Sequence, residues 1–204
     1  MASANGAFGG LRREINWDGV PDLWADPKAL PANFCNLNSP RGAVFSTPVS
    51  GFLVSADAGS TPAPLFGFGN DLQAFNAQRL FKAVNSNTTD VHFFLPGTTT
   101  ATTTRAFGVV FVDAEVAGLT RLPFFDGNDA LIYTHDAAVA GNQGFSFLGA
   151  TVSGAAIARV CITSGLTTIL ANGALGNPID DLVVMDDFCM ASHCRLSLSR
   201  LEWR

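Results

Sequence analysis

Apolar and polar side chains alternate along much of the chain with a period of two, which is the pattern of half-buried β-strands. Residues 156–163 show this alternation most clearly, with Arg159 on the polar face. Residues 105–113 carry apolar side chains on both faces, which predicts a central strand covered on both sides. Further strands are expected at residues 14–18, 42–47, 51–56, 78–84, 90–95, 119–125, 130–134, 144–152 and 179–188.

Turn-forming residues separate these segments and indicate how they connect. Residues 42–47 and 51–56 flank Pro48, which predicts a hairpin or a kinked pair of strands. Residues 78–84 are expected to form a short edge strand, and residues 19–38 a long irregular connection of the kind that often carries function. Many short strands without a helical period predict an all-β, single-domain antiparallel β-sandwich with the strand order of a jelly roll.

The chain is expected to divide into three parts. Residues 1–13 form a flexible N-terminal segment, residues 14–188 form the β-sandwich domain, and residues 189–204 form a C-terminal tail of uncertain structure. The sandwich segment shows no internal repeat and no linker, which favours one domain.

The composition is that of a chain that buries a large core. Hydrophobic residues make up 48% and charged residues 14% of its 204 residues, which argues against the polar, highly charged composition of a disordered protein. The chain has 17 Phe against 3 Trp and 1 Tyr, so most aromatic rings are expected in the core. The net charge of −5, without a basic face, argues against a nucleic-acid partner.

The termini and the cysteines bear on the compartment. No segment is long and apolar enough to predict a membrane span, and residues 1–10 lack the pattern of a secretion signal. Four cysteines are too few for a disulfide scaffold. Cys161 is expected as a small buried residue, whereas Cys189 and Cys194 are close enough for a local disulfide under oxidising conditions. With His193 between them they still lack a fourth ligand for zinc.

Several sequence segments together resemble a family of uncharacterised secreted bacterial β-sandwich proteins. The matching segments are residues 14–22, 39–47, 107–108, 145–149, 157–160 and 183–188. The resemblance covers roughly residues 12–188 and implies an extracellular or cell-surface location, although the chain shows no signal peptide. More broadly the chain is similar to carbohydrate-binding jelly-roll domains, many of which carry a structural calcium. Its ending after Phe188 departs from the family pattern.

This resemblance implies a calcium site between the two ends of the domain. The first and last strands of a jelly roll commonly lie near each other, which would bring Glu14 or Asp18 close to Asp186 or Asp187. Calcium binds six to eight oxygens, and carboxylates at strand ends supply them. Alternation places both acids of the last strand among apolar neighbours, which is costly without a cation or donors. The alternative is that one acid points to solvent while the other caps a turn or pairs with an arginine, Arg13 or Arg41.

Three aromatic residues are candidates for stacking against a sugar. Trp24 lies in a loop between two aspartates, and Trp17 and Tyr133 are the other aromatic side chains with a polar group. The alternative for Trp24 is that it packs onto the sandwich as an anchor of the loop.

Catalytic patterns are weak. The sequence has no Gly-x-Ser-x-Gly motif, and His135 and Asp136 are adjacent, so they point to opposite faces of a strand. Asp113 and Glu115 could share a face as a glycosidase pair, but we expect ordinary solvated acids there.

Three functional hypotheses follow, in decreasing order of support. The first is a noncatalytic extracellular module that binds a glycan or a cell-surface component and holds a structural calcium. The second is a structural subunit that self-assembles, for which low charge and a high Phe content are suitable. The third is a hydrolase on a lectin-like sandwich.

Overall fold

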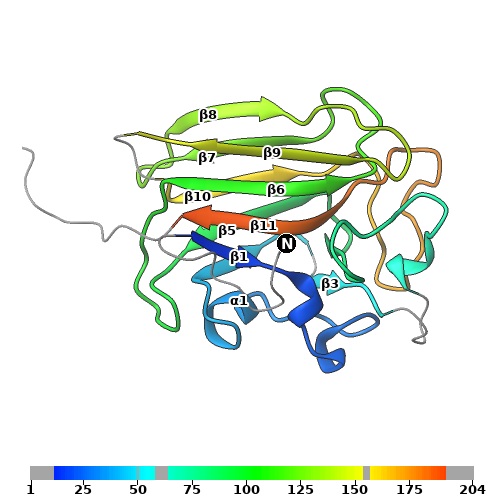
Figure 1. Cartoon of the computed structure of the whole chain (residues 1–204), viewed down its shortest axis with the longest axis horizontal. Helices are drawn as coiled ribbons and strands as arrows, with labels where there is room; N and C mark the ends of the chain where they lie inside the picture. The colour runs from blue at the N-terminus through cyan, green and yellow to red at the C-terminus, as the bar shows by residue number, and fades with distance from the viewer. Residues whose placement is uncertain (1–11, 50, 58–63, 154–156, 192–204) are drawn as a thin grey trace, which may run out of the picture.

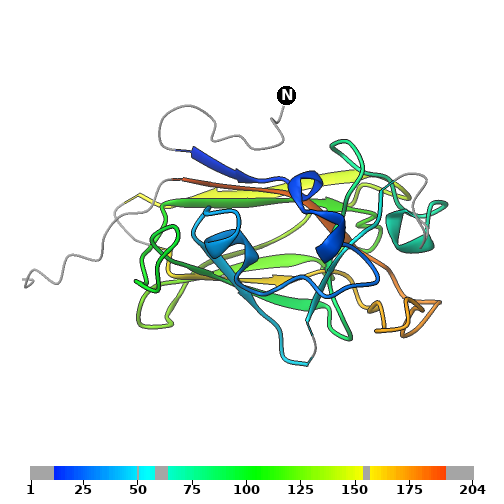
Figure 2. The ribbon, with the colours of Figure 1, turned by 90° about the horizontal axis from the view of Figure 1, so that it is seen from below.

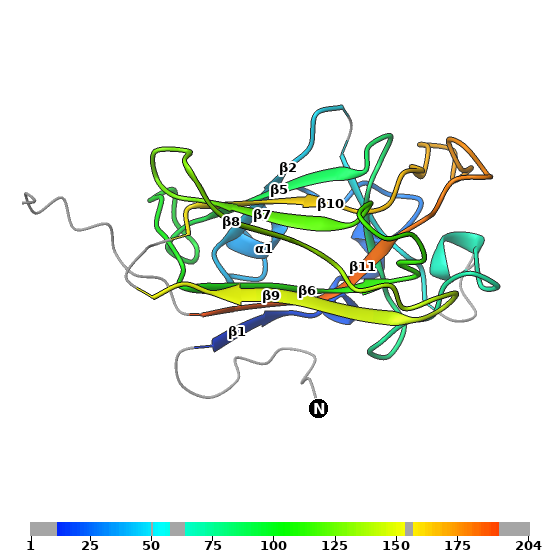
Figure 3. The same cartoon turned by 90° about the horizontal axis from the view of Figure 1, so that it is seen from above.

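The computed structural model describes residues 12–49, 51–57, 64–153 and 157–191. It shows two antiparallel sheets packed face to face (Figures 1, 2 and 3). The first sheet has the order β3-β4-β11-β6-β9, with β1 also paired to β11, and the second has the order β2-β5-β10-β7-β8. The predicted single-domain antiparallel β-sandwich is therefore confirmed. Strands β4 to β11 are ordered as β4-β11-β6-β9 and β5-β10-β7-β8, which is compatible with a jelly roll.

The first sheet consists of β1 (Arg12–Ile15), β3 (Phe52–Val54), β4 (Phe81–Ala83), β6 (Ala106–Val112), β9 (Phe145–Thr151) and β11 (Val184–Ala191). The second sheet consists of β2 (Ala43–Ser46), β5 (Thr88–Phe93), β7 (Arg121–Phe125), β8 (Leu131–Asp136) and β10 (Arg159–Thr163). The helical segments are short: α1 (Phe34–Leu37) and the 3₁₀ turns η1 (Trp17–Gly19), η2 (Asp22–Trp24) and η3 (Leu65–Gly67).

The strand at the start of the domain is shorter than predicted and begins earlier. It covers Arg12–Ile15 instead of residues 14–18. The side chain of Asn16 accepts a hydrogen bond from the amide of Asp18 at 2.9 Å, and this local turn starts η1. At the other end, β11 runs from Val184 to Ala191, so it continues beyond the expected domain boundary.

Two predictions about how the strands are arranged are wrong. The expected hairpin of residues 42–47 and 51–56 does not form, because β2 pairs with β5 and β3 pairs with β4 in the opposite sheet. The expected edge strand at residues 78–84 is β4, which lies inside its sheet between β3 and β11.

The core between the sheets is aromatic, as the composition predicts. Its largest rings are exposed by 2% or less and belong to Trp17, Phe45, Phe52, Phe81, Phe93, Phe107, Phe111, Phe124 and Phe188. Among the described residues, no helix is long and apolar enough to cross a membrane. Cys194 and His193 lie outside the described residues, so the local disulfide stays a prediction.

Candidate functional site

The last strand carries an irregularity that brings two acids into the interior. The pairing of β11 with β6 shifts between Met185 and Phe188, which marks a β-bulge at Asp186 and Asp187. On the other side of β11, Met185 pairs with β4 and Phe188 pairs with Ile15 of β1. The bulge therefore lies at the junction of β1, β4 and β11. Figure 1 shows β1 and β11, the two ends of the domain, side by side.

Three carboxyl side chains are buried at this junction, and we call them the junction acids: Glu14, Asp186 and Asp187. Their residues are exposed by only 3%, 1% and 2%. Asp186 Oδ2 accepts hydrogen bonds from the amides of Phe75 at 2.7 Å and Asn76 at 3.4 Å. Asp187 Oδ2 accepts one from the side-chain amide of Asn76 at 3.2 Å. The sequence prediction that these acids come together is thus matched by their placement.

The donors do not satisfy all the oxygens of the junction acids. Oε2 of Glu14 and Oδ1 of Asp187 are buried without a hydrogen-bond partner. The two carboxyls lie within hydrogen-bonding reach of each other, and Asp187 also lies within reach of Asp186. Since a carboxylate has no donor, such a contact requires either a proton or a cation between the oxygens.

The pKa values reflect this arrangement. Burial, and then the charge of Asp187, raises the pKa of Glu14 to about 7 and that of Asp186 to about 8. Burial also raises the pKa of Asp187. Arg41 lies close enough to lower the Glu14 pKa in part, and its Nε donates to the main-chain oxygen of Glu14 at 3.0 Å.

Asp18, the fourth predicted ligand, has a different primary role. Its Oδ1 accepts hydrogen bonds from the amides of Gln78 at 3.0 Å and Arg79 at 2.9 Å, so it fixes the loop that precedes β4. The same loop donates to Asp186 and Asp187 through residues 75 and 76. Asp18 still acts on the pKa of Asp187 and therefore lies in its electrostatic environment.

A second acidic group can also hold a metal ion. One carboxylate oxygen each of Asp113, Glu115 and Asp181 lie within 4.8 Å of one another. Asp113 is buried and accepts a hydrogen bond from the amide of Gln143 at 2.9 Å, and burial raises its pKa to about 6. Glu115 is exposed.

Sequence reasoning identified only part of this second group. Asp113 and Glu115 were expected to be ordinary solvated acids, and for Asp113 that prediction is wrong. Asp181 was not singled out at all. It precedes β11, and the buried ammonium group of Lys82 partly offsets the rise in its pKa that burial causes.

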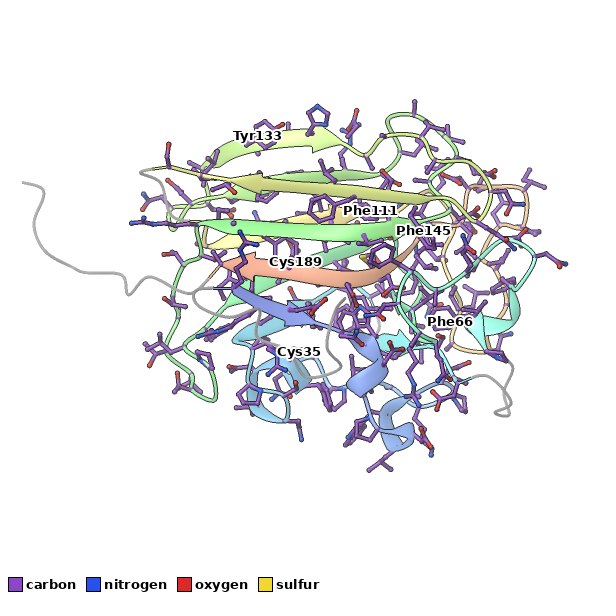
Figure 4. All side chains as sticks on the ribbon, viewed as in Figure 1. Cys35, Phe66, Phe111, Tyr133, Phe145 and Cys189 are labelled. Carbon is purple, nitrogen blue, oxygen red and sulfur yellow. The ribbon has the colours of Figure 1, made fainter. Side chains whose placement is uncertain are left out.

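The three aromatic residues that were predicted to stack against a sugar lie apart from one another. Trp17 is fully buried, stacks on Phe81 with ring centroids 4.2 Å apart, and has no face free for a sugar. Trp24 is partly buried and packs against the core, as its alternative anchoring role predicted. Tyr133 is 42% exposed on β8, at the margin of the second sheet (Figure 4).

An exposed aromatic surface lies instead on the outer face of the first sheet. Phe145 and Phe147 of β9 are 39% and 63% exposed, and Phe75 is 53% exposed. The rings of Phe75 and Phe145 meet edge to face at a centroid distance of 5.4 Å. Figure 4 shows Phe145 at one end of β9. The sequence did not reveal this surface, because phenylalanine was expected in the core.

No protein-family model and no curated protein matches the chain. Two solved structures are similar to it, each with a TM-score of 0.34. One is the enzymatically active domain of tailspike protein 4 of bacteriophage CBA120, with 10% identity over 79% of this chain and 20% of that chain. The other is the CBM22-1–GH10 part of endo-1,4-β-D-xylanase 10B of Clostridium thermocellum in complex with xylohexaose, with 14% identity over 80% of this chain and 28% of that chain. The chain spans less than a third of either protein, and the likeness is too distant to transfer a site or a function.

Proposed function

We propose that this chain is a noncatalytic extracellular binding module whose β-sandwich is closed by a calcium ion at the junction acids and whose ligand is a glycan. The observation that carries the calcium site is the buried contact between Glu14 and Asp187, in which Oε2 and Oδ1 have no donor. Two ionised carboxyls in contact away from water repel each other and have lost their hydration, which is costly unless a cation compensates them.

The chemistry of the junction favours calcium among the common cations. Its candidate side-chain ligands are carboxylate oxygens, which hard cations prefer. Calcium accepts irregular coordination that includes backbone carbonyls, whereas magnesium requires a near-octahedral shell and usually keeps several waters. A buried bulge between three strands offers irregular oxygen ligands and little room for retained water.

The junction acids are a better calcium site than the second acidic group for an energetic reason. In the second group both carboxylate oxygens of Asp181 are also buried without a hydrogen-bond partner, but the charge of Lys82 acts on Asp181 and Glu115 is exposed. The junction acids are all buried, and Arg41 compensates Glu14 only in part. Because all three of its carboxyls are buried, we place the ion at the junction.

The support for a glycan ligand is the aromatic surface formed by Phe75, Phe145 and Phe147. Exposed aromatic side chains gathered on one sheet face mark an interaction site, and their flat rings suit the C–H faces of sugars. The same surface also suits the alternative of self-association, so the tests below separate the two.

Calcium binding is tested by thermal unfolding in calcium and in chelator. A ligand at about 100 times its Kd stabilises the folded chain by about 2.7 kcal/mol, which raises the Tm of a domain of this size by roughly 5–10 °C. We expect this shift in the wild type and in Asp181→Asn, and its loss in Asp187→Asn. An equal shift in Asp187→Asn would refute the junction site, and a shift lost only in Asp181→Asn would place the ion at the second group.

Glycan binding is tested with the full chain on a glycan array and by light scattering. Reproducible binding to a restricted set of glycans from a monomeric solution supports the module. Uniform silence on the array, together with concentration-dependent oligomers, would contradict it in favour of the structural subunit.

A further inference from the structure

The outer face of the first sheet contains a groove beside the exposed ring of Phe147. The groove has a volume of about 450 Å³ and is lined by residues of β1, β6, β9 and β11. This volume falls within the range of small-ligand sites. The groove lies on the face of the sheet away from the core. Phe107 and Val109 point into the core between the sheets, so Gly108 between them faces the opposite side.

Two facing glycines form the floor of the groove. Gly108 of β6 pairs directly with Gly149 of β9. A Cβ on Gly108 would lie 2.7 Å from Cζ of Phe147, and one on Gly149 would lie 3.0 Å from the same atom. The tip of the Phe147 ring therefore rests against the sheet at a place where only glycine leaves room. Because the residue is still 63% exposed, the ring keeps a surface open to solvent.

The charge of the groove is opposite to that of the whole chain. The net charge is −5 with only 12 lysines and arginines, yet one of these, Arg12, presents its side chain to the groove. The neighbouring Arg13 lines the groove too, but its guanidinium donates to the main-chain oxygen of Arg41 at 3.3 Å on the other face of β1. None of the described residues that line it is acidic. Glu14 and Asp187 act on the pKa of one lining residue, Cys189, and the cation that the proposed function places between them would offset their charge.

We propose that this groove binds an acidic saccharide, with a pyranose ring on Phe147 and a sugar carboxylate on the guanidinium group of Arg12. This inference rests on the proposed glycan-binding function and names the surface and the ligand class. A guanidinium pairs with a carboxylate through two parallel hydrogen bonds, which gives orientation as well as attraction. Small residues, Gly149, Gly108 and Cys189, lie side by side on the strands between the ring of Phe147 and β1, so one saccharide can extend over them toward Arg12.

The test is calorimetric titration of the full chain with trigalacturonic acid and with cellotriose as a neutral trisaccharide. We expect the wild type to bind the acidic sugar more tightly. Phe147→Ala and Arg12→Gln should each weaken that binding by about tenfold, the usual size of a lost charged or stacking contact. Arg121→Gln and Leu131→Ala alter an exposed arginine and an exposed leucine of the second sheet and serve as matched controls, with affinity unchanged.

The possible failures of this test are distinguishable. Equal affinity for both trisaccharides would overturn the acidic ligand. Binding that survives in both Phe147→Ala and Arg12→Gln would overturn the groove while leaving glycan binding intact. No binding of trigalacturonic acid overturns this inference, and the glycan array then shows whether the proposed function fails with it. Melting curves of each variant confirm that the fold is retained.

Discussion

At the scale of single residues, Trp17 connects the core to the junction acids. Its ring stacks on Phe81 at an interplanar angle of 7° and meets Phe188 edge to face at 5.1 Å. Its indole N–H donates to the main-chain oxygen of Asp186 at 2.8 Å. One buried side chain thus packs the centre of the sandwich and fixes the backbone of the bulge.

Replacing Trp17 should therefore separate packing from hydrogen bonding. Trp17→Ala opens a large cavity and is expected to lower the free energy of unfolding by about 3–5 kcal/mol. Trp17→Phe keeps an aromatic ring but leaves the Asp186 oxygen without its donor, with an expected loss of about 1–3 kcal/mol. Urea unfolding measures both. Equal losses would show that the packing of the ring contributes little, and no loss in Trp17→Phe would show that the hydrogen bond contributes little.

The junction acids predict how stability depends on pH when calcium is removed. Their pKa values are raised on folding, so between about pH 4 and pH 8 the folded state holds more protons than the unfolded state. The contribution of these acids to the free energy of unfolding is therefore full at low pH and is lost as the pH rises. Urea unfolding in chelator from about pH 5 to pH 7 should show a declining contribution that is smaller in Asp187→Asn. The measurement ends at pH 7 because burial lowers the pKa of Lys82 to about 7. Above that pH the titration of Lys82 adds its own pH dependence to the free energy of unfolding. Identical slopes in both proteins would contradict this account.

At the scale of elements, Arg79 holds the segment that leads from β1 into the sandwich. Its side chain is only 4% exposed and pairs with Asp57 and, at 2.5 Å, with Asp22 of η2. Nη1 also donates to the main-chain oxygen of Val20 at 2.7 Å. The loop before β4 is thereby joined to η1 and η2 by one buried guanidinium.

Loss of this guanidinium should loosen the segment locally. We expect Arg79→Met to cost about 2–4 kcal/mol, because the carbonyl of Val20 and the carboxylate of Asp57 lose a buried partner. Hydrogen exchange should accelerate at residues 17–25 and remain slow in β6. Arg121→Met, which removes an ion pair that is about half exposed on both sides, should change stability by less than about 1 kcal/mol. Uniform acceleration across the whole chain would contradict a local role.

The sequence predicted the strands better than their partners. Period-two patterning located β6 and β10 because their burial alternates or is complete on both faces. It could not show that β2 and β3 enter different sheets, since nothing local distinguishes one sheet from the other. The junction acids were predicted because the ends of such a domain meet. The second acidic group was missed because Asp181 reaches Asp113 only through the tertiary fold.

At the scale of the whole molecule, the proposed calcium ion joins the two ends of the sandwich. β1 and β11 are the first and last strands of the described chain, and they pair along four residues of β1. Glu14 and Asp187 come from these two strands, so a cation between them opposes their separation. Removal of calcium should therefore speed global unfolding, and stopped-flow unfolding in chelator would measure this. An unchanged rate would show that the β1–β11 pairing is already formed in the transition state or that the ion contributes little to stability.

The central claim is tested most directly by terbium luminescence, because Tb³⁺ binds oxygen ligands as Ca²⁺ does and emits when a nearby tryptophan is excited. Trp17 donates a hydrogen bond to the backbone of Asp186, so an ion at the junction acids lies close to its indole. We predict emission that calcium competes away, that persists in Trp24→Phe and Asp181→Asn, and that is lost in Trp17→Phe and Asp187→Asn. Emission that is undiminished in Asp187→Asn, or none in the wild type, would contradict a cation site at this junction.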